Sequence, residues 1–376
     1  MMTSDRVATT QGVSGAVSRR GFVTALGGVA LTALTGCGPG GSPFAARPGS
    51  GAGATGAFAL LPLTGDAAAL GQDMARAMSL AAAGLTLPVA LDAGDSPEAA
   101  AAAAKTAIEG HARLILGPLR ADQVPAVLEV AGDVPVLTFS NDENLAGSGV
   151  FIFGVTPAQS VATMFSYAKA QGAQRVAMVA ADTPYGRSAG AAAQAFAAAG
   201  GLNLSATLLR DPGKSGLAGA LRDASGGVMP EAVFLPDRGA ALQAFARGLK
   251  GSGVQIMGST QWGLGADAEV LSNPDLDGAW YAAPAPDPFQ NFANRFLGSF
   301  GTTPGFVTAL GHDAAQVAME LGASGKMSRK GLLRAEGFNG ALGHFKFRPD
   351  GRCTRDLSVL ALKEGRVVAL GEVTDT

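Results

Sequence analysis

The sequence predicts an α/β protein of two lobes, each built around a parallel sheet. Short apolar runs of strand length alternate with longer segments of helical spacing, an alternation typical of βαβ units. The alternation begins near residue 57 and is repeated from about residue 151. The chain of 376 residues also exceeds what one ordinary core supports, so two domains are expected.

The elements follow from this alternation. In the first lobe, strands are expected at 57–61, 87–91, 113–116 and 134–139, and helices at 70–83, 97–110 and 123–131. From residue 151 the pattern repeats, with strands expected at 151–155, 175–180, 202–209, 232–235 and 254–257, and helices at 159–171, 188–199, 217–224 and 239–249. Later strands are expected at 279–283 and 345–347, with helices at 289–300 and 307–322 between them.

Composition excludes several classes of function. With 28 Lys and Arg against 30 Asp and Glu, the net charge is −2 and no basic stripe is present, so nucleic acid is not an expected partner. The three histidines, His111, His312 and His344, are scattered without the spacing of a metal site, and neither a metal nor a cofactor is expected. Cys353 is expected to be a buried, inert thiol.

The first 36 residues have the pattern of an export signal. The motif Ser-Arg-Arg-Gly-Phe-Val at 18–23 precedes an apolar run that ends at residue 34. This run is far below the ~20 residues that a membrane-spanning helix needs. The motif resembles a twin-arginine signal, and a general secretory signal is the alternative.

The signal ends in Leu-Thr-Gly-Cys at 34–37, which resembles the lipobox of bacterial lipoproteins. The resemblance implies that Cys37 becomes the lipidated first residue, so that a lipid anchor is the only contact with the membrane. Residues 37–56 are rich in Gly, Ala, Pro and Ser and are predicted to form a flexible tether. The expected location is the periplasm, and Gly38 after the cysteine favours the outer membrane.

Six short motifs follow one another along the rest of the chain. They are Leu-Pro-Leu-Thr-Gly at 61–65, Asp-Ala-Gly-Asp-Ser-Pro-Glu-Ala at 92–99, Leu-Ile-Leu-Gly-Pro at 114–118, Asp-Thr-Pro-Tyr-Gly at 182–186, Gly-His-Asp-Ala at 311–314 and Gly-His-Phe-Lys-Phe at 343–347. In this order they resemble the type I periplasmic solute-binding proteins. The resemblance is to the branch of the branched-chain amino-acid receptors, which have a leucine-binding-protein domain.

This resemblance implies two Rossmann-like lobes that face each other across a ligand cleft and are joined by a hinge of several strands. Lobe 1 is expected to hold 57–153 and 284–343, and lobe 2 to hold 154–283 and 344–376. The hinge crossings are expected near 151–156, 279–284 and 344–347. Open parallel sheets bind ligands at the carboxyl ends of their strands, so the loops there are the expected site.

The resemblance also implies which residues hold the ligand. In the amino-acid receptors, hydroxyl and amide groups of the first lobe bind the α-carboxylate, and a tyrosine and an acid of the second lobe bind the α-ammonium group. The matching positions are Asp66, Arg120, Ser140, Asn141 and Asp142 in the first lobe, and Tyr185, Asp237, Thr260 and Trp262 in the second. The loop at 118–122 has no hydroxyl and the loop at 140–143 has two acids, so this clamp is only partly present.

Several of these residues have a simpler alternative role. Asp66 and Asp142 follow strands, where an acid often caps the next helix. Arg120 has Asp122 as a possible ion-pair partner. Tyr185 can pack within its own turn, and Trp262 can be a core residue.

An enzyme is not expected. The Gly-Arg-Ser-Ala-Gly motif at 186–190 matches the nucleophile elbow of hydrolases. An elbow needs its serine directly at the strand end, whereas Ser188 lies several residues past the strand expected at 175–180.

The expected function is the binding of a small polar solute, such as an amino acid or an amide, for delivery to the permease of an ABC importer. The alternative is an outer-membrane lipoprotein that activates a penicillin-binding protein through protein contacts. Pro-Val-Leu-Thr-Phe-Ser-Asn-Asp at 135–142 and Gly-Ala-Trp-Tyr-Ala-Ala-Pro at 278–284 resemble a bacterial subgroup labelled as such activators.

Overall fold

The first lobe contains a five-stranded sheet of order β2-β1-β3-β4-β5, in which every neighbouring pair is parallel. Its strands are β1 Ala57–Leu61, β2 Val89–Asp92, β3 Leu114–Leu116, β4 Val136–Thr138 and β5 Val150–Ile152. The computed structural model describes residues 56–82, 87–147, 149–263 and 267–373, all within one unit, Ser42–Thr376. The export signal, Cys37 and residues 38–55 of the tether lie outside the described residues.

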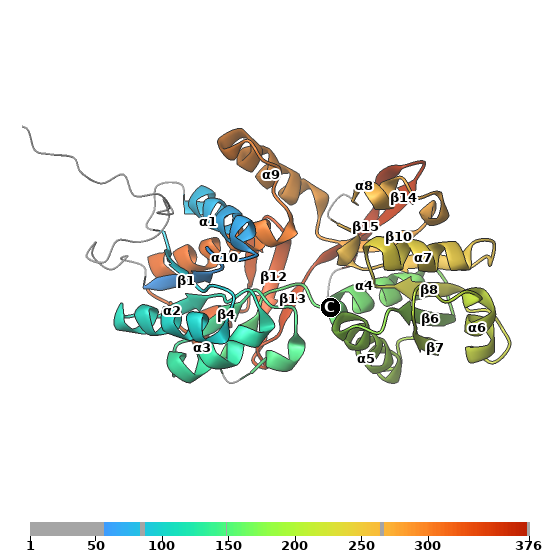
Figure 1. Ribbon diagram of the computed structural model, residues 1–376, viewed down its shortest axis with the longest axis horizontal. Coiled ribbons are helices and arrows are strands. Elements are labelled where there is room, and N and C mark those ends of the chain that lie inside the picture. Colours follow the sequence, from blue (N-terminus) through green and yellow to red (C-terminus); the bar gives the residue numbers. More distant parts are fainter. Residues whose placement is uncertain (1–55, 83–86, 148, 264–266, 374–376) are drawn as a thin grey trace, which may run out of the picture. The chain divides into compact units, whose positions relative to one another are not determined.

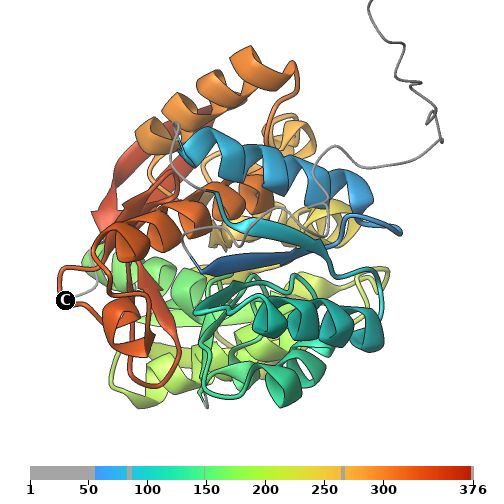
Figure 2. The ribbon, with the colours of Figure 1, turned by 90° about the vertical axis from the view of Figure 1, so that its left-hand side faces the viewer.

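Helices cover both faces of this sheet. The helices α2 (Pro97–Glu109) and α3 (Val124–Ala131) pack on one face, and α1 (Ala68–Ala82) and α10 (Phe306–Ala323) pack on the other (Figure 1). Figure 2 shows α1 alongside α10, which comes from the far end of the sequence. Strands that are apolar along their whole length suit this arrangement, because both faces of the sheet are buried.

The second sheet has seven strands in the order β15-β14-β10-β9-β8-β6-β7. These are β6 Arg175–Ala180, β7 Asn203–Leu209, β8 Ala232–Leu235, β9 Gln255–Gly258, β10 Trp280–Ala283, β14 Leu357–Lys363 and β15 Arg366–Val373. The first five in the chain are parallel, whereas β14 and β15 add an antiparallel hairpin at one edge. This hairpin was not among the expected strands, although its two turn residues, Glu364 and Gly365, both have the positive φ that such a tight turn requires.

Helices also cover both faces of the second sheet. The helices α4 (Pro157–Ala170) and α5 (Pro184–Ala198) pack on one face, and α6 (Leu217–Ala224) and α7 (Gly239–Leu249) on the other. The helix expected at 188–199 begins earlier because the Thr183 hydroxyl accepts a hydrogen bond from Gly186 N at 3.0 Å and so caps it at Thr183.

Five short elements, the longer helix α9 and the short helix α11 complete the described part of the chain. They are η1 Ala121–Gln123, η2 Glu143–Leu145, η3 Thr260–Trp262, α8 Ala268–Leu271, η4 Pro274–Leu276, α9 Pro286–Phe300 and α11 Arg329–Leu332. A small antiparallel sheet is formed by β11 Phe338–Gly340, β12 Gly343–Phe347 and β13 Cys353–Arg355. Among the helices of the described ranges, none combines the length and the apolar character needed to cross a bilayer.

The placement of residues 344–355 in lobe 2 is corrected by the core packing. The strands β12 and β13 join the core of the first lobe, where the Phe345 ring lies 5.0 Å from the Phe153 ring and Phe347 lies 5.5 Å from Phe151. The third crossing between the lobes is therefore at Asp356, between β13 and β14, and not at 344–347. The expectation of a buried Cys353 is confirmed, and burial raises the pKa of its thiol to about 11.

Candidate functional site

Two adjoining cavities, each of about 690 Å³, lie at the carboxyl ends of the parallel strands of both sheets. Four residues line both cavities: Ala121 after β3, Asn141 after β4, Arg238 after β8 and Gln261 after β9. The cavities therefore share part of their walls, and we call them together the cleft. This is the position at which open parallel sheets bind ligands.

One half of the cleft, the apolar cavity, has a hydrophobic wall contributed by the first lobe. This wall consists of Leu70, Leu119, Phe139, Phe289, Phe306, Val307 and Leu310. Thr260, Gln261 and Asp267 face it from the second lobe. An apolar wall with a few polar groups is the usual composition of a small-molecule site, since the wall gives affinity and the polar groups give orientation.

In the other half, which we call the polar cavity, nine of the fifteen lining residues are polar or charged, among them Asn141, Asp142, Tyr185, Asp237 and Arg238. Within the described part of the chain, the side chains of Asn141 and Arg238 have no hydrogen-bond or ion-pair partner. Both residues also line the apolar cavity. They are therefore an amide and a cation that are available to a ligand where the two halves meet.

Local hydrogen bonds fix the loop that carries Asn141. The Thr138 hydroxyl donates to Pro118 O at 2.8 Å and accepts from Ser140 N at 3.2 Å. The Ser140 hydroxyl in turn accepts from Asp142 N at 3.1 Å. The loops after β3 and β4 are thus held together before any ligand binds.

Asp142 has a structural partner as well as a place in the polar cavity. Its carboxylate accepts from Asn144 N at 3.0 Å and from Asn144 Nδ2 at 2.8 Å, and so caps η2. These contacts therefore support helix capping, the alternative role considered for Asp142.

In the second lobe, Asp237 connects two of the loops that line the cleft. Its carboxylate accepts a hydrogen bond of 3.1 Å from Ala181 N, which follows β6. Burial raises the pKa of Asp237 above its usual 3.8, and this hydrogen bond opposes the rise.

Tyr185 lies in the first turn of α5 with its hydroxyl buried in the wall of the polar cavity. The hydroxyl lies near Ser259, Thr260 and Gln261 but makes no hydrogen bond of normal geometry with any described residue. Burial raises the pKa of Tyr185, so the phenol is neutral over the physiological range.

The loop after β9 is also fixed by local hydrogen bonds. The Ser259 hydroxyl donates to Pro236 O at 2.7 Å and accepts from Gln261 N at 3.1 Å. Thr260 N donates to Ser160 Oγ at 3.3 Å. These bonds hold Thr260 and Gln261 at the border of the cleft.

Three residues proposed from the sequence are not brought into the cleft. Asp66 is exposed, with its N–H donating to the Asp95 carboxylate at 3.0 Å. Arg120 is exposed and forms an ion pair of 3.2 Å with Asp122. Trp262 is a core residue, which corrects its assignment as a ligand contact: it is fully buried, its indole N–H donates to Leu235 O at 3.2 Å, and its ring stacks on Tyr281 at 5.8 Å.

The sequence interpretation missed the apolar wall and Arg238. Phe289 and Phe306 lie in the first turns of α9 and α10, at the start of the segment that returns to the first lobe. A phenylalanine at the start of a helix that follows a crossing between the lobes could have indicated this wall from the sequence. Arg238 stood beside Asp237, but its freedom from an ion pair could not be read from the sequence.

No group of three or more His, Cys, Asp or Glu side chains within the described ranges is arranged to hold a metal ion. The cleft is therefore best described as a site for an organic solute, with one cation, three acids, of which Asp142 and Asp237 accept backbone hydrogen bonds, and an apolar wall.

Comparison with known proteins agrees with this geometry. The chain matches the periplasmic binding protein family over residues 59–366. A comparison with curated protein sequences found no match.

Solved structures have the same fold. A protein of Rhodospirillum rubrum described as a branched-chain amino acid ABC transporter has a TM-score of 0.72 at 20% identity, covering 84% of this chain and 99% of its own. The leucine binding protein LivK of Thermotoga maritima has a TM-score of 0.59 at 20% identity, with 85% and 98% covered. An ABC transporter solute binding protein of R. palustris, in complex with benzoate, has a TM-score of 0.59 at 18% identity, with 85% and 97% covered.

At these identities the solved structures show the shared fold alone, whereas the family match extends over most of the sequence. The two parallel sheets and the cleft at their strand ends are the architecture that the sequence motifs implied. The chain belongs to the periplasmic binding protein family and has the two-lobed fold of its type I solute-binding members.

Proposed function

We propose that this chain is a non-enzymatic solute-binding protein that takes a small ligand into the cleft and delivers it to the permease of an ABC importer. The observation that carries the proposal is the cleft itself, formed by the strand ends of two sheets with about 690 Å³ in each half. Small-molecule sites commonly have volumes of ~300–1,000 Å³. The importer as partner is supported by the ABC transporter proteins that share the fold.

The ligand of this proposal carries a carboxylate at one end and an apolar or aromatic group at the other. Arg238 and Asn141 are free to bind a carboxylate where the two halves of the cleft meet. The wall that includes Leu70, Phe139 and Phe306 suits an apolar group. This ligand class is narrower than the small polar solutes expected from the sequence.

An α-ammonium group is not required by the proposal. The two acids of the polar cavity already accept backbone hydrogen bonds, Asp142 from Asn144 N and Asp237 from Ala181 N, whereas Asp267 of the apolar cavity stands at the N-cap of α8 without a side-chain capping bond. Leucine and benzoate, named for two of the neighbours, share a carboxylate and an apolar portion and are therefore the first ligands to test.

The test is a thermal-shift screen on purified protein that has been unfolded and refolded to remove any co-purified ligand. The panel holds amino acids, benzoates, amides, sugars and muropeptide fragments. A ligand at about 100 times its Kd adds ~2.7 kcal/mol, a shift of a few degrees for a chain of this size. We expect shifts from small carboxylates with an apolar group and none from sugars.

A flat panel with folded protein would contradict the solute-binding proposal. It would favour the activator of a penicillin-binding protein that residues 135–142 and 278–284 suggest. Pull-downs with cell-wall synthases then become the next experiment.

The proposal places the protein in the periplasm, exported by the twin-arginine route and held by a lipid on Cys37, in the outer membrane. Metabolic labelling with palmitate tests the anchor, and we expect Cys37→Ser to lose the label. Replacement of Arg19 and Arg20 by lysine tests the route, and we expect it to stop export. Export of the lysine variant at the normal rate would favour the general secretory route instead.

A further inference from the structure

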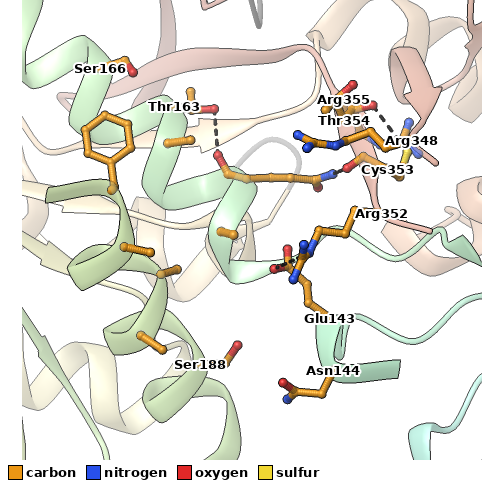
Figure 3. Close-up of a pocket in the computed structure, with 17 residues that line it drawn as sticks. Glu143, Asn144, Thr163, Ser166, Ser188, Arg348, Arg352, Cys353, Thr354 and Arg355 are labelled. Carbon is orange, nitrogen blue, oxygen red and sulfur yellow. Dashed lines mark hydrogen bonds and ion pairs between the residues drawn. The ribbon is translucent and has the colours of Figure 1, made fainter. Parts of the chain in front are cut away.

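A third cavity, of about 760 Å³, adjoins the cleft, and Figure 3 shows the residues that line it. One wall is formed by α4 and α5 of the second lobe. The other is formed by η2, the turn between β12 and β13, and β13 itself. We call this cavity the arginine groove; it shares only Asn144 and Ser188 with the polar cavity of the cleft.

Three arginines line the arginine groove: Arg348, Arg352 and Arg355. Glu143 is the one acid that lines it, and Arg352 Nε lies 3.6 Å from the Glu143 carboxylate (Figure 3). Arg348 and Arg352 also share Asp350, at 3.5 and 3.2 Å. With Asp313, the ion-pair partner of Arg355, three arginines are matched by three carboxylates, so a preference for an anion would come from guanidinium donors that these pairs leave unused and not from a net positive charge.

Arg355 is the buried member of this set, with 4% of its surface exposed. Its Nη1 donates to Leu342 O at 3.3 Å, and its ion-pair partner, Asp313, is 3.8 Å away. Its Nη2 is buried and has no hydrogen-bond partner among the described residues. A buried donor without a partner destabilises a protein, whereas an oxyanion beside it would supply the missing hydrogen bond.

The opposite wall of the groove mixes apolar and polar side chains. The apolar ones are Ala158 and Ala162 on α4 and Ala191, Ala192, Ala195 and Phe196 on α5, and the polar ones are Gln159, Thr163, Ser166 and Ser188. Alanine side chains leave room between the helices and the arginines, and Phe196 supplies one aromatic surface. The groove therefore offers arginines on one side and, on the other, one aromatic ring and several alanines interspersed with hydroxyl and amide groups.

We propose that the arginine groove is a second ligand site, which binds a small organic anion. The phosphate or carboxylate of this anion faces Arg348, Arg352 and Arg355, and its apolar ring or chain packs against α4 and α5. The site is separate from the carboxylate position proposed in the cleft, because Arg238 does not line the groove.

Phenyl phosphate is the first probe, because it combines a dianionic oxyanion with an aromatic ring. Binding to the purified protein is measured by isothermal titration calorimetry, with benzoate and inorganic phosphate in parallel. The three titrations distinguish the kind of anion. Binding of phenyl phosphate alone indicates an organic phosphate. Binding of benzoate that is weakened by the same arginine substitutions indicates a carboxylate.

The variants separate the groove from the cleft. The double variant Arg348→Ala, Arg352→Ala removes two exposed arginines and is expected to weaken phenyl phosphate binding about tenfold or more. Arg247→Ala is the matched control, since Arg247 is exposed on α7 and lines none of the three cavities. Arg238→Ala is the cleft control and is expected to leave phenyl phosphate binding unchanged.

Thermal unfolding of each variant checks the fold, and exposed ion pairs of this kind contribute only ~0–1 kcal/mol. Three results would overturn the proposal: no binding of phenyl phosphate or benzoate to the wild-type protein, equal affinity in the double variant, or loss of phenyl phosphate binding in Arg238→Ala.

Discussion

The carboxylate of Asp237, in the loop after β8, accepts a hydrogen bond of 3.1 Å from Ala181 N, in the loop after β6. Burial raises the pKa of this carboxyl above 3.8. The folded protein thus holds the proton of Asp237 more tightly than the unfolded chain does. Stability is therefore favoured while Asp237 is protonated, and it falls as the pH rises from 3.8 through the raised pKa.

The first prediction concerns Asp237→Asn. The asparagine Oδ1 can still accept from Ala181 N, but it carries no charge that burial opposes. We expect the variant to have a higher Tm than the wild type at pH 7, and the difference to shrink as the pH falls toward 3.8. Thermal melts across this range measure it, with the exposed Asp223→Asn as the control for the loss of one negative charge. A lower Tm for Asp237→Asn at pH 7 would show that the carboxylate charge is stabilising.

The second prediction concerns the Tyr185 hydroxyl, which is buried without a hydrogen bond of normal geometry. Removal of such a group relieves a desolvation cost. Tyr185→Phe is therefore expected to keep or slightly raise the Tm of the protein without ligand. A clear loss of Tm would mean that the hydroxyl already has a strong partner in the folded protein.

The third prediction concerns Gly154, directly after β5. A Cβ atom there would lie 2.5 Å from Ser140 O and 2.6 Å from Phe139 O, both in the backbone of the loop that carries Asn141. Gly154→Ala is expected to reduce the free energy of unfolding by about 1–3 kcal/mol, because the backbone must shift to relieve the overlap. The control is Gly298→Ala on α9, where a Cβ meets nothing within 4 Å and a small gain in stability is expected. Denaturant unfolding measures the free energy of unfolding of both variants. Equal values for the two would contradict the prediction.

The fourth prediction concerns the buried Asp313 on α10. It accepts from Ala341 N at 2.6 Å and from Leu342 N at 3.1 Å, and it is the ion-pair partner of Arg355. Asp313→Ala is expected to destabilise the protein by roughly 3–5 kcal/mol, since it leaves a buried guanidinium without its acid.

The comparison for Asp313 is Asp182→Ala, which breaks the exposed ion pair with Arg187. Exposed pairs contribute about 0–1 kcal/mol. Urea unfolding curves compare the two variants. A similar, small loss in both would mean that burial adds nothing to the Asp313 network.

The sequence predicted the strands well because their apolar character is local. The run Ala57–Leu61 is buried throughout, as expected of a strand covered on both faces. The hairpin of β14 and β15 was missed, and residues 344–355 were assigned to the wrong lobe. That assignment depends on whether Phe345 packs against Phe153 or against the second sheet, a contact between residues far apart in the chain.

The candidate site was predicted less completely, because its chemistry depends on which side chains already have partners. The sequence pointed to Asp66 and Arg120, but each lies outside the cleft with a local partner, Asp95 or Asp122. Trp262 follows a strand like a ligand residue, yet its indole N–H is bonded to Leu235 O. Asn141, Tyr185 and Asp237 do line the polar cavity; their contact with a ligand stays a prediction.

The last prediction tests the central claim, that the cleft binds a small carboxylate with an apolar group through Arg238. Isothermal titration calorimetry with L-leucine and with benzoate is carried out on the wild-type protein, Arg238→Ala and Arg247→Ala. We expect at least one of the two to bind the wild type, with affinity reduced about tenfold or more in Arg238→Ala and unchanged in Arg247→Ala, because only Arg238 lines the cleft. Absence of binding to the wild-type protein, or equal affinity in Arg238→Ala, would contradict the account.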